Sequence, residues 1–132
     1  MSGVHVRVRV AEEHYALPVD RVLEVAELGE LTPVPGAPAQ IIGVRNLRGQ
    51  VIPVIALATL LGLPGAEPER IVVAEAGERR AGLAVDVIVD VSELPEASEQ
   101  VDSPYLTDAA LVDGVLVGML DADAVLSSEA SA

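Results

Sequence analysis

Residues 17–28 read LPVDRVLEVAEL, and a closely similar stretch returns 66 positions later, where residues 83–94 read LAVDVIVDVSEL. Six of the twelve aligned positions are identical. A shift of 65 also aligns Gly49 with Gly114, so the period continues beyond this stretch. A repeat of this length indicates two units of the same build that cover each other's faces and edges. We therefore expect a duplicated fold.

Each unit is predicted to contain about five β-strands. Valines alternate with polar residues over residues 4–10, which is the two-residue period of a strand with one buried face. Asp113-Gly114 separates two apolar runs and is a strong hairpin signal. The expected strands are residues 4–10, 15–19, 22–28, 41–47, 51–55, 70–75, 79–86, 87–92, 106–112 and 115–120, with short helical turns near 57–61 and 121–126.

The composition favours one domain rather than two. Of 132 residues, 51 % are hydrophobic, which is enough for a shared core, whereas a half of the chain alone would be marginally stable. Phe and Trp are absent, so the core must consist mainly of Val, Leu, Ile and Ala. We predict a mainly β single domain over residues 1–132. Its two small barrels are expected at roughly 14–66 and 67–126, with strand 4–10 in the shared core.

Missing residue types exclude several functions. All eight basic residues are Arg, so a Walker-type phosphate loop and a Schiff-base enzyme are excluded. The absence of Cys excludes thiol nucleophiles, thiolate metal sites and disulfides, and makes the reducing cytoplasm the expected location. A net charge of -13 opposes nucleic acid and anionic membranes. The uncharged residues 49–66 are interrupted by Pro and Gly, so we expect no membrane insertion. Proteins are the expected partners.

Catalytic and metal-binding residues are hard to find in this chain. His5 and His14 could hold a metal or act as acid and base, but neither has a partner at ligand spacing, and solvent-facing strand positions are favoured. Asp121 and Asp123 suit a helix cap better than a calcium site. No catalytic residue, metal or cofactor is predicted. The alternative is a small-molecule-binding β-barrel or hydrolase that uses His5, His14 and Asp121.

Arg45 and Arg48 place two of the eight positive charges at one predicted hairpin end, next to Gly49. An Arg fork at such a place can bind a partner's carboxylate. The other interpretation is a pair of solvated surface arginines. From the residues alone, the chain is more consistent with a duplicated β module that binds proteins than with an enzyme.

Residues 43–55, GVRNLRGQVIPVI, followed by LLGL at 60–63, resemble the signature of CheW-like domains, the coupling proteins of bacterial chemotaxis. The similarity continues in residues 17–25, 82–86 and 105–121 and covers roughly residues 4–126. Two positions depart from the family pattern. Ala56 stands where an Asp is usual, and Val8 stands where an aromatic residue is common.

The resemblance implies two intertwined SH3-like five-stranded β-barrels with short helices. It also implies a non-enzymatic adaptor that joins the histidine kinase CheA, through the kinase's own CheW-like regulatory domain, to the cytoplasmic tips of chemoreceptors. A CheW-like scaffold in a two-component pathway unrelated to motility is the alternative within this family. Transferred to this sequence, the receptor- and kinase-binding positions are Val22, Glu24, Arg48 and Ile88 in a groove between the barrels, with Ile71 and Gly82 nearby.

Overall fold

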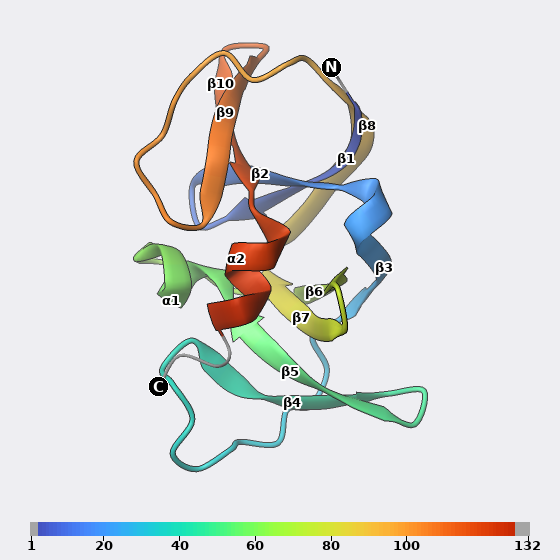
Figure 1. Cartoon of the computed structure of the whole chain (residues 1–132). Helices are drawn as coiled ribbons and strands as arrows, with labels where there is room; N and C mark the ends of the chain where they lie inside the picture. Colours follow the sequence, from blue (N-terminus) through green and yellow to red (C-terminus); the bar gives the residue numbers. More distant parts are fainter. Residues whose placement is uncertain (1–2, 129–132) are drawn as a thin grey trace.

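Two five-stranded sheets make up most of the computed structural model, which describes residues 3–128 (Figure 1). Sheet A has the strand order β8-β1-β2-β10-β9, and sheet B has the order β3-β6-β7-β5-β4. The strands are β1 (Gly3–Val10), β2 (Glu13–Pro18), β3 (Val22–Glu27), β4 (Ile41–Leu47), β5 (Gln50–Ala56), β6 (Arg70–Ala76), β7 (Arg79–Val85), β8 (Val87–Leu94), β9 (Leu106–Val112) and β10 (Val115–Leu120). The helical elements are η1 (Val19–Arg21), α1 (Leu57–Leu61) and α2 (Ala122–Ser127).

The predicted strands and both short helices are present, with bounds that differ by only a few residues. This agreement arises because the strands are short, alternate in burial and are separated by turns whose residues signal them. In β1, for example, Val6, Val8 and Val10 are buried, whereas the Arg and His residues between them are only partly buried. Strand periodicity therefore carries over directly from sequence to structure.

The sheets do not follow the two halves of the chain. Sheet A takes β1 and β2 from the first repeat and β8 to β10 from the second, and sheet B takes the remaining strands. Exchanging the equivalent strands of the two repeats converts one sheet order into the other. The division therefore differs from the predicted boundaries of roughly 14–66 and 67–126. Local periodicity predicts a strand but not its partner, because pairing depends on which edges the folded chain brings together.

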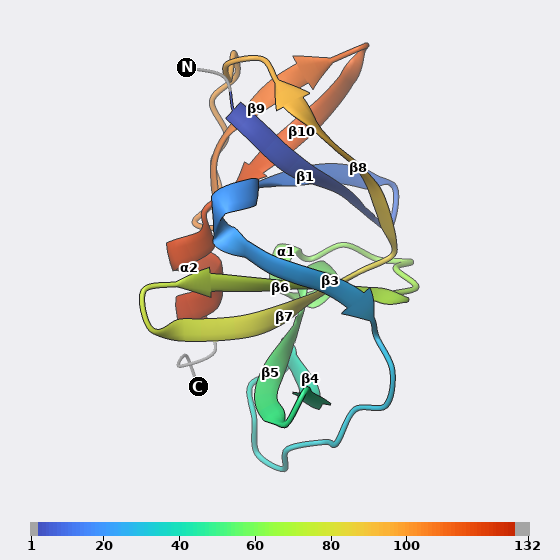
Figure 2. The same ribbon diagram turned by 90° about the vertical axis from the view of Figure 1, so that its right-hand side faces the viewer.

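The repeated stretch quoted at the outset is where each repeat crosses from one sheet to the other. Residues 17–28 lead from β2 in sheet A to β3 in sheet B, and residues 83–94 lead from β7 in sheet B to β8 in sheet A. We call β3 and β8 the crossover strands. Each forms an edge of its sheet, and Figure 2 shows β3 toward the viewer, with β8 beside β1 above it.

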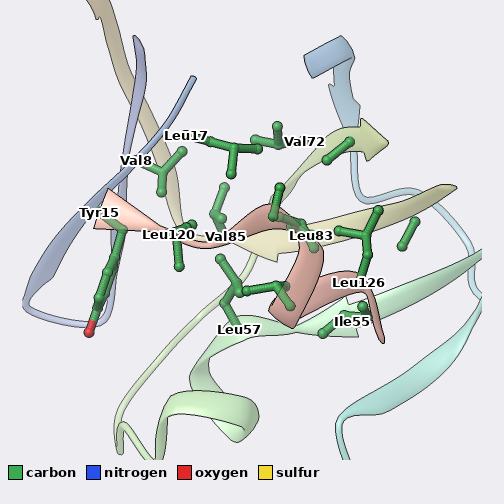
Figure 3. Packing of buried hydrophobic residues seen from close by; sticks show 14 of the residues in the cluster. Val8, Tyr15, Leu17, Ile55, Leu57, Val72, Leu83, Val85, Leu120 and Leu126 are labelled. Atoms are coloured by element: carbon green, nitrogen blue, oxygen red, sulfur yellow. The ribbon is translucent and has the colours of Figure 1, made fainter. Parts of the chain in front are cut away.

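The shared core lies between the sheets (Figure 3). Sheet A contributes Val8, Tyr15 and Leu17, and sheet B contributes Val72 and Leu83 among others. Val6, Val8 and Val10 of β1 belong to this cluster, as the sequence predicts for strand 4–10, whereas Val4 at the start of the strand is exposed. Both repeats of the chain thus bury apolar surface together, which stabilises the crossed arrangement.

Each sheet also curls around an interior of its own, on the side away from the shared core. The interior of sheet B is apolar and includes Ile52, Val54, Ile71, Val73 and Ala84. The interior of sheet A has a smaller buried apolar set, namely Ala16, Leu94 and Val117. These interiors make each sheet a small barrel, and they differ in polarity.

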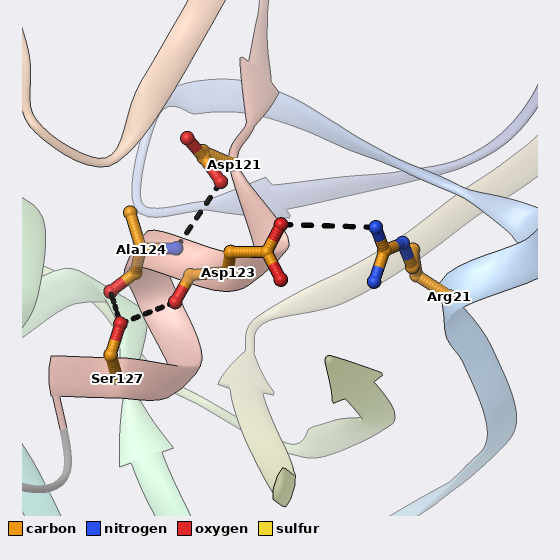
Figure 4. A network of polar contacts seen from close by, with 5 residues as sticks. All are labelled: Arg21, Asp121, Asp123, Ala124 and Ser127. Carbon is orange, nitrogen blue, oxygen red and sulfur yellow. Dashed lines mark hydrogen bonds and ion pairs between the residues drawn. The ribbon is translucent and has the colours of Figure 1, made fainter. Parts of the chain in front are cut away.

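The two helices begin differently. Asp121 caps α2, because its Oδ1 accepts a hydrogen bond of 3.2 Å from the Ala124 amide (Figure 4). Ala56 precedes α1 with nearly the same backbone conformation and provides no side-chain cap. The predicted capping role of Asp121 is confirmed, as is the missing cap at Ala56. Over residues 3–128, the structure contains no helix of the length and apolarity that crossing a membrane requires.

Candidate functional site

The structure brings two of the transferred positions, Glu24 and Arg48, together at the surface. Glu24 lies on crossover strand β3, and Arg48 lies in the turn between β4 and β5 at the opposite edge of sheet B. An Arg48 terminal nitrogen lies 3.4 Å from Glu24 Oε1. The Arg48 side chain is 82 % exposed and that of Glu24 is 30 % exposed. A contact of this kind is weak in water, so the guanidinium remains accessible to a partner.

The backbone at Arg48 is unusual. Arg48 and Gly49 have φ values of 53° and 81°, and the equivalent turn of sheet A, Asp113-Gly114, has values of 49° and 81°. Both turns have two residues and need positive φ at each position. Asp tolerates the left-handed conformation better than Arg, for which the cost is roughly 1 kcal/mol or more. The turn thus contains an exposed Arg that its own geometry disfavours, and such residues often serve function.

Arg45, which the sequence grouped with Arg48, has a different role. Its Nε donates a hydrogen bond of 3.0 Å to the Leu28 carbonyl, and its Nη1 donates one of 2.8 Å to the Asn46 carbonyl. A Cβ at Gly29 would lie 2.6 Å from Arg45 Nε, so this glycine leaves the space that the guanidinium occupies. Arg45 thus holds the loop after β3 against β4, and two of its nitrogen atoms already donate hydrogen bonds within the chain. Only Arg48 remains for a partner.

The other transferred positions lie deeper. Val22 on β3 and Ile88 on β8 are partly buried and pack against the rim of the shared core. Ile71 is fully buried inside sheet B. Gly82 is buried beside it, because a Cβ there would lie 3.4 Å from Ile71 Cδ1. Ile71 and Gly82 therefore support the sheet from within and are not exposed to a partner.

The crossover strands expose apolar side chains that the residue-by-residue transfer missed. Leu23 and Val25 project from β3, and Val87, Val89 and Val91 project from β8. Val91 is 58 % exposed, and the 66-residue shift aligns it with Val25. The signal in the sequence was the apolar character of both faces of residues 22–26 and 87–91, which a half-exposed strand does not need.

The alternative catalytic set does not converge. His5 lies opposite Pro18 and His14 lies opposite Arg9, so the two histidines are at different levels of β1 and β2. His5 Nδ1 lies 2.7 Å from the Gly3 carbonyl, and Asp121 caps α2. The expected solvent-facing position is wrong for His14, whose Nδ1 is buried. No group of three or more His, Asp or Glu within residues 3–128 is arranged to hold a metal ion.

A pocket of about 360 Å³ lies near the start of α2, between β2, β10 and the loop after β8. Two of its polar groups have structural roles. Asp121 caps the helix, and Asp123 Oδ2 lies 3.8 Å from a terminal nitrogen of Arg21 (Figure 4). Ser127 donates hydrogen bonds to the carbonyls of Asp123 and Ala124 one turn later. The acids here stabilise α2 and connect it to η1.

Comparison with known proteins identifies relatives over nearly the whole chain. The model of the CheW-like domain matches residues 5–130. The chemotaxis protein CheW of Bacillus subtilis is 36 % identical over an alignment covering 90 % of this chain and 83 % of that protein. The chemotaxis protein CheW of Thermotoga maritima is 32 % identical, with 89 % and 83 % covered. The crystal structure of the scaffolding protein TtCheW from Thermoanaerobacter tengcongensis superimposes with a TM-score of 0.83 at 29 % identity, covering 92 % of this chain and 90 % of that one.

Proposed function

The chain belongs to the family of CheW-like domains, and from this premise we propose that it is a non-enzymatic adaptor that couples chemoreceptors to the histidine kinase CheA in chemotaxis signalling. Its mainly β fold of two intertwined SH3-like barrels is that of a related scaffolding protein. An adaptor needs surfaces rather than a reactive centre. In the proposed role the chain acts in the cytoplasm, where the receptor tips and the kinase are located.

The observation that carries the proposal is the exposed apolar surface of the crossover strands. Leu23 and Val25 on β3 and Val87, Val89 and Val91 on β8 are each more than one-third exposed. Apolar side chains clustered on edge strands favour association with another protein, because association removes them from water. The receptor tip is proposed to contact this surface, with Val22 and Ile88 holding the two strands against the core.

The Glu24–Arg48 pair adds a polar contact on the same strand, β3, where Glu24 points to the face opposite Val25. Because the pair is weak and Arg48 is largely exposed, the guanidinium can exchange Glu24 for an acidic side chain of a partner. The left-handed backbone of Arg48 supports this role, since a turn selected for stability alone would favour Asn or Asp, as at Asp113. Arg48 is therefore proposed as the specificity contact of the adaptor.

Kinase docking is proposed at the hairpin ends of the two barrels. Val51 on β5 is 61 % exposed, and Leu116, its equivalent on β10, is also exposed. The repeat thus presents two similar apolar hairpin ends, one per barrel. The sheet A end at Leu116 belongs to a different sheet from β3, whereas Val51 follows the Arg48 turn that contacts Glu24 on β3. A protein with separate surfaces for receptor and kinase can hold both at once, and coupling requires this.

Binding of a receptor cytoplasmic fragment and of the regulatory domain of CheA tests the proposal. Calorimetry should detect both partners, and a mixture of the three proteins should place the kinase under receptor control only when this chain is present. Val25→Glu should weaken receptor binding at least about tenfold. Val34→Glu is the matched control, because Val34 is similarly exposed but lies in the loop before β4.

Absence of binding by the folded wild-type chain to either partner would refute the adaptor function. Equal loss of receptor binding in Val25→Glu and Val34→Glu would leave the adaptor function intact but would reject the crossover strands as the receptor surface.

A further inference from the structure

The interior of the sheet A barrel contains an unusual concentration of basic side chains. His5, Arg7 and Arg9 of β1 point to the face opposite the shared core, and His14 of β2 lies across from Arg9 on the same face. The chain has eight Arg and two His residues, and four of these ten lie here. In a protein of net charge -13, this grouping does not follow from composition.

Two of these side chains have buried nitrogen atoms without a hydrogen-bond partner, namely Arg7 Nε and His14 Nδ1. Arg7 pairs with Ala16, two residues from His14 on β2, so the two side chains are diagonal neighbours. Diagonal side chains of this kind lie about 7 Å apart at the backbone and can reach one shared group. An unpaired buried donor costs about 1–3 kcal/mol, and more when it is charged, so two adjacent ones suggest a missing acceptor.

The sheet B barrel shows how the same positions are satisfied when the fold itself provides the partner. The 66-residue shift aligns Arg9 with Glu75 and His14 with Arg80. Arg80 Nε lies 3.7 Å from Glu75 Oε2, and Arg80 Nη1 lies 3.3 Å from Gln50 Oε1. Sheet B therefore has a cation facing an acid where sheet A has Arg9 facing His14. The shift also aligns Arg7 with the apolar Val73, so the buried Arg is specific to sheet A.

Two acids of the same barrel lie near this group, but neither forms an ion pair with Arg7 or His14. Asp90 of β8 lies opposite Arg7, but its Oδ1 accepts a 3.0 Å hydrogen bond from the Ser92 hydroxyl. Asp108 of β9 faces the same interior, and its Oδ1 accepts a 2.9 Å hydrogen bond from the Thr107 hydroxyl. Within residues 3–128, no acid lies within ion-pair distance of Arg7 or His14.

We propose that Arg7 and His14 bind one carboxylate group inside the sheet A barrel. A carboxylate has two oxygen atoms in one plane, which match the Nε and a terminal nitrogen of a guanidinium, and His14 can donate from Nδ1. The side chains are partly exposed as a whole, but Arg7 Nε and His14 Nδ1 are buried, so binding requires the two side chains to move apart and admit the group from solvent. Ala16 and Val117 beneath are buried and apolar, which strengthens a charged hydrogen bond there. The carboxylate belongs either to a small free acid or to an acidic side chain of another protein.

Nuclear magnetic resonance provides a direct test, because the chain has only two histidines. Sodium acetate is titrated into the labelled protein, with sodium chloride at the same concentrations as the reference. The His14 imidazole signals should move and saturate with acetate, while those of His5, whose Nδ1 is held by the Gly3 carbonyl, should not. Capped Gly-Asp-Gly and Gly-Asn-Gly peptides distinguish the source. Saturation by the Asp peptide indicates a protein side chain, and saturation by acetate alone indicates a free acid.

Matched variants identify the residues responsible. Arg7→Gln should weaken acetate binding at least about tenfold, because it removes a charge-assisted hydrogen bond. Arg70→Gln removes the same charge from an exposed position of β6 and should bind acetate like the wild type. If Arg7→Gln does not fold, acetate binding is measured with Arg7→Lys instead. This variant retains the positive charge but loses the planar guanidinium, so it should also bind acetate more weakly. Equal shifts of both histidines, no saturation, or unchanged binding by folded Arg7 variants would overturn the proposal.

Discussion

Replacing Arg48 by Asn separates the contribution of this residue to folding from its contribution to binding. The structure provides two opposing effects on the free energy of unfolding. Asn accepts the left-handed backbone at φ 53° more readily than Arg, which should stabilise the fold by about 0.5–1 kcal/mol. The variant also loses the Glu24 contact. At 3.4 Å this contact is worth at most about 1.2 kcal/mol in water, and exposed pairs typically measure about 0.2–1 kcal/mol.

The two effects nearly cancel, so the free energy of unfolding should stay within about 0.5 kcal/mol of the wild-type value. In a chain of this size the melting temperature should then change by no more than about 1–3 °C. Binding should respond differently, because an interface Arg that loses its acidic partner typically costs 2 kcal/mol or more, roughly thirtyfold in affinity. Circular dichroism melting and calorimetry on one preparation measure both quantities.

Asp113→Asn is the matched control, since it makes the same replacement residue in the equivalent turn of sheet A. It should leave melting and partner binding nearly unchanged. A fall in melting temperature of more than about 5 °C in Arg48→Asn would show that Arg48 is a structural residue. Full binding of both partners by the folded variant would show that the exposed guanidinium contacts neither.

Two further predictions concern the helix caps and the buried tyrosine. Asp121→Ala removes a cap and should destabilise the chain by about 1 kcal/mol. Ala56→Asp adds one, but it should stabilise the chain by only about 0.5 kcal/mol, because Ala56 is only 7 % exposed and the new carboxylate would be largely buried. Thermal melts in which both variants moved in the same direction would reject the capping argument. Burial, with a smaller contribution from Glu13, raises the pKa of the Tyr15 phenol above its ordinary value of about 10, so the folded state favours the neutral ring. The resulting stability is present below the ordinary pKa and is lost as pH rises through the higher folded pKa. Tyr15→Phe should therefore lose less stability than the wild type as pH is raised. Identical alkaline denaturation curves for the two proteins would contradict this.

The candidate site was only partly predictable from sequence. The hairpin signal around Gly49 placed Arg48 at an exposed turn, and the resemblance added Glu24, but no local pattern joins residues 24 positions apart on opposite edges of one sheet. The sequence also did not predict which of the transferred positions are exposed to solvent. Ile71 and Gly82 have the same apolar character as exposed valines on β8, yet they lie inside sheet B because both faces of β6 and β7 are covered.

Local chemistry alone determined the strands, their turns and the duplication, because alternation and Gly-containing turns act over a few residues. Pairing was decided by the tertiary structure. The repeat predicts that residues 17–28 and 83–94 have equivalent roles, but only the folded chain shows that each crosses to the other sheet. Crossing buries apolar strand faces from both repeats in one core, which neither half could achieve alone. The same long-range packing brings Glu24 to Arg48 and leaves Arg7 Nε without a hydrogen-bond partner.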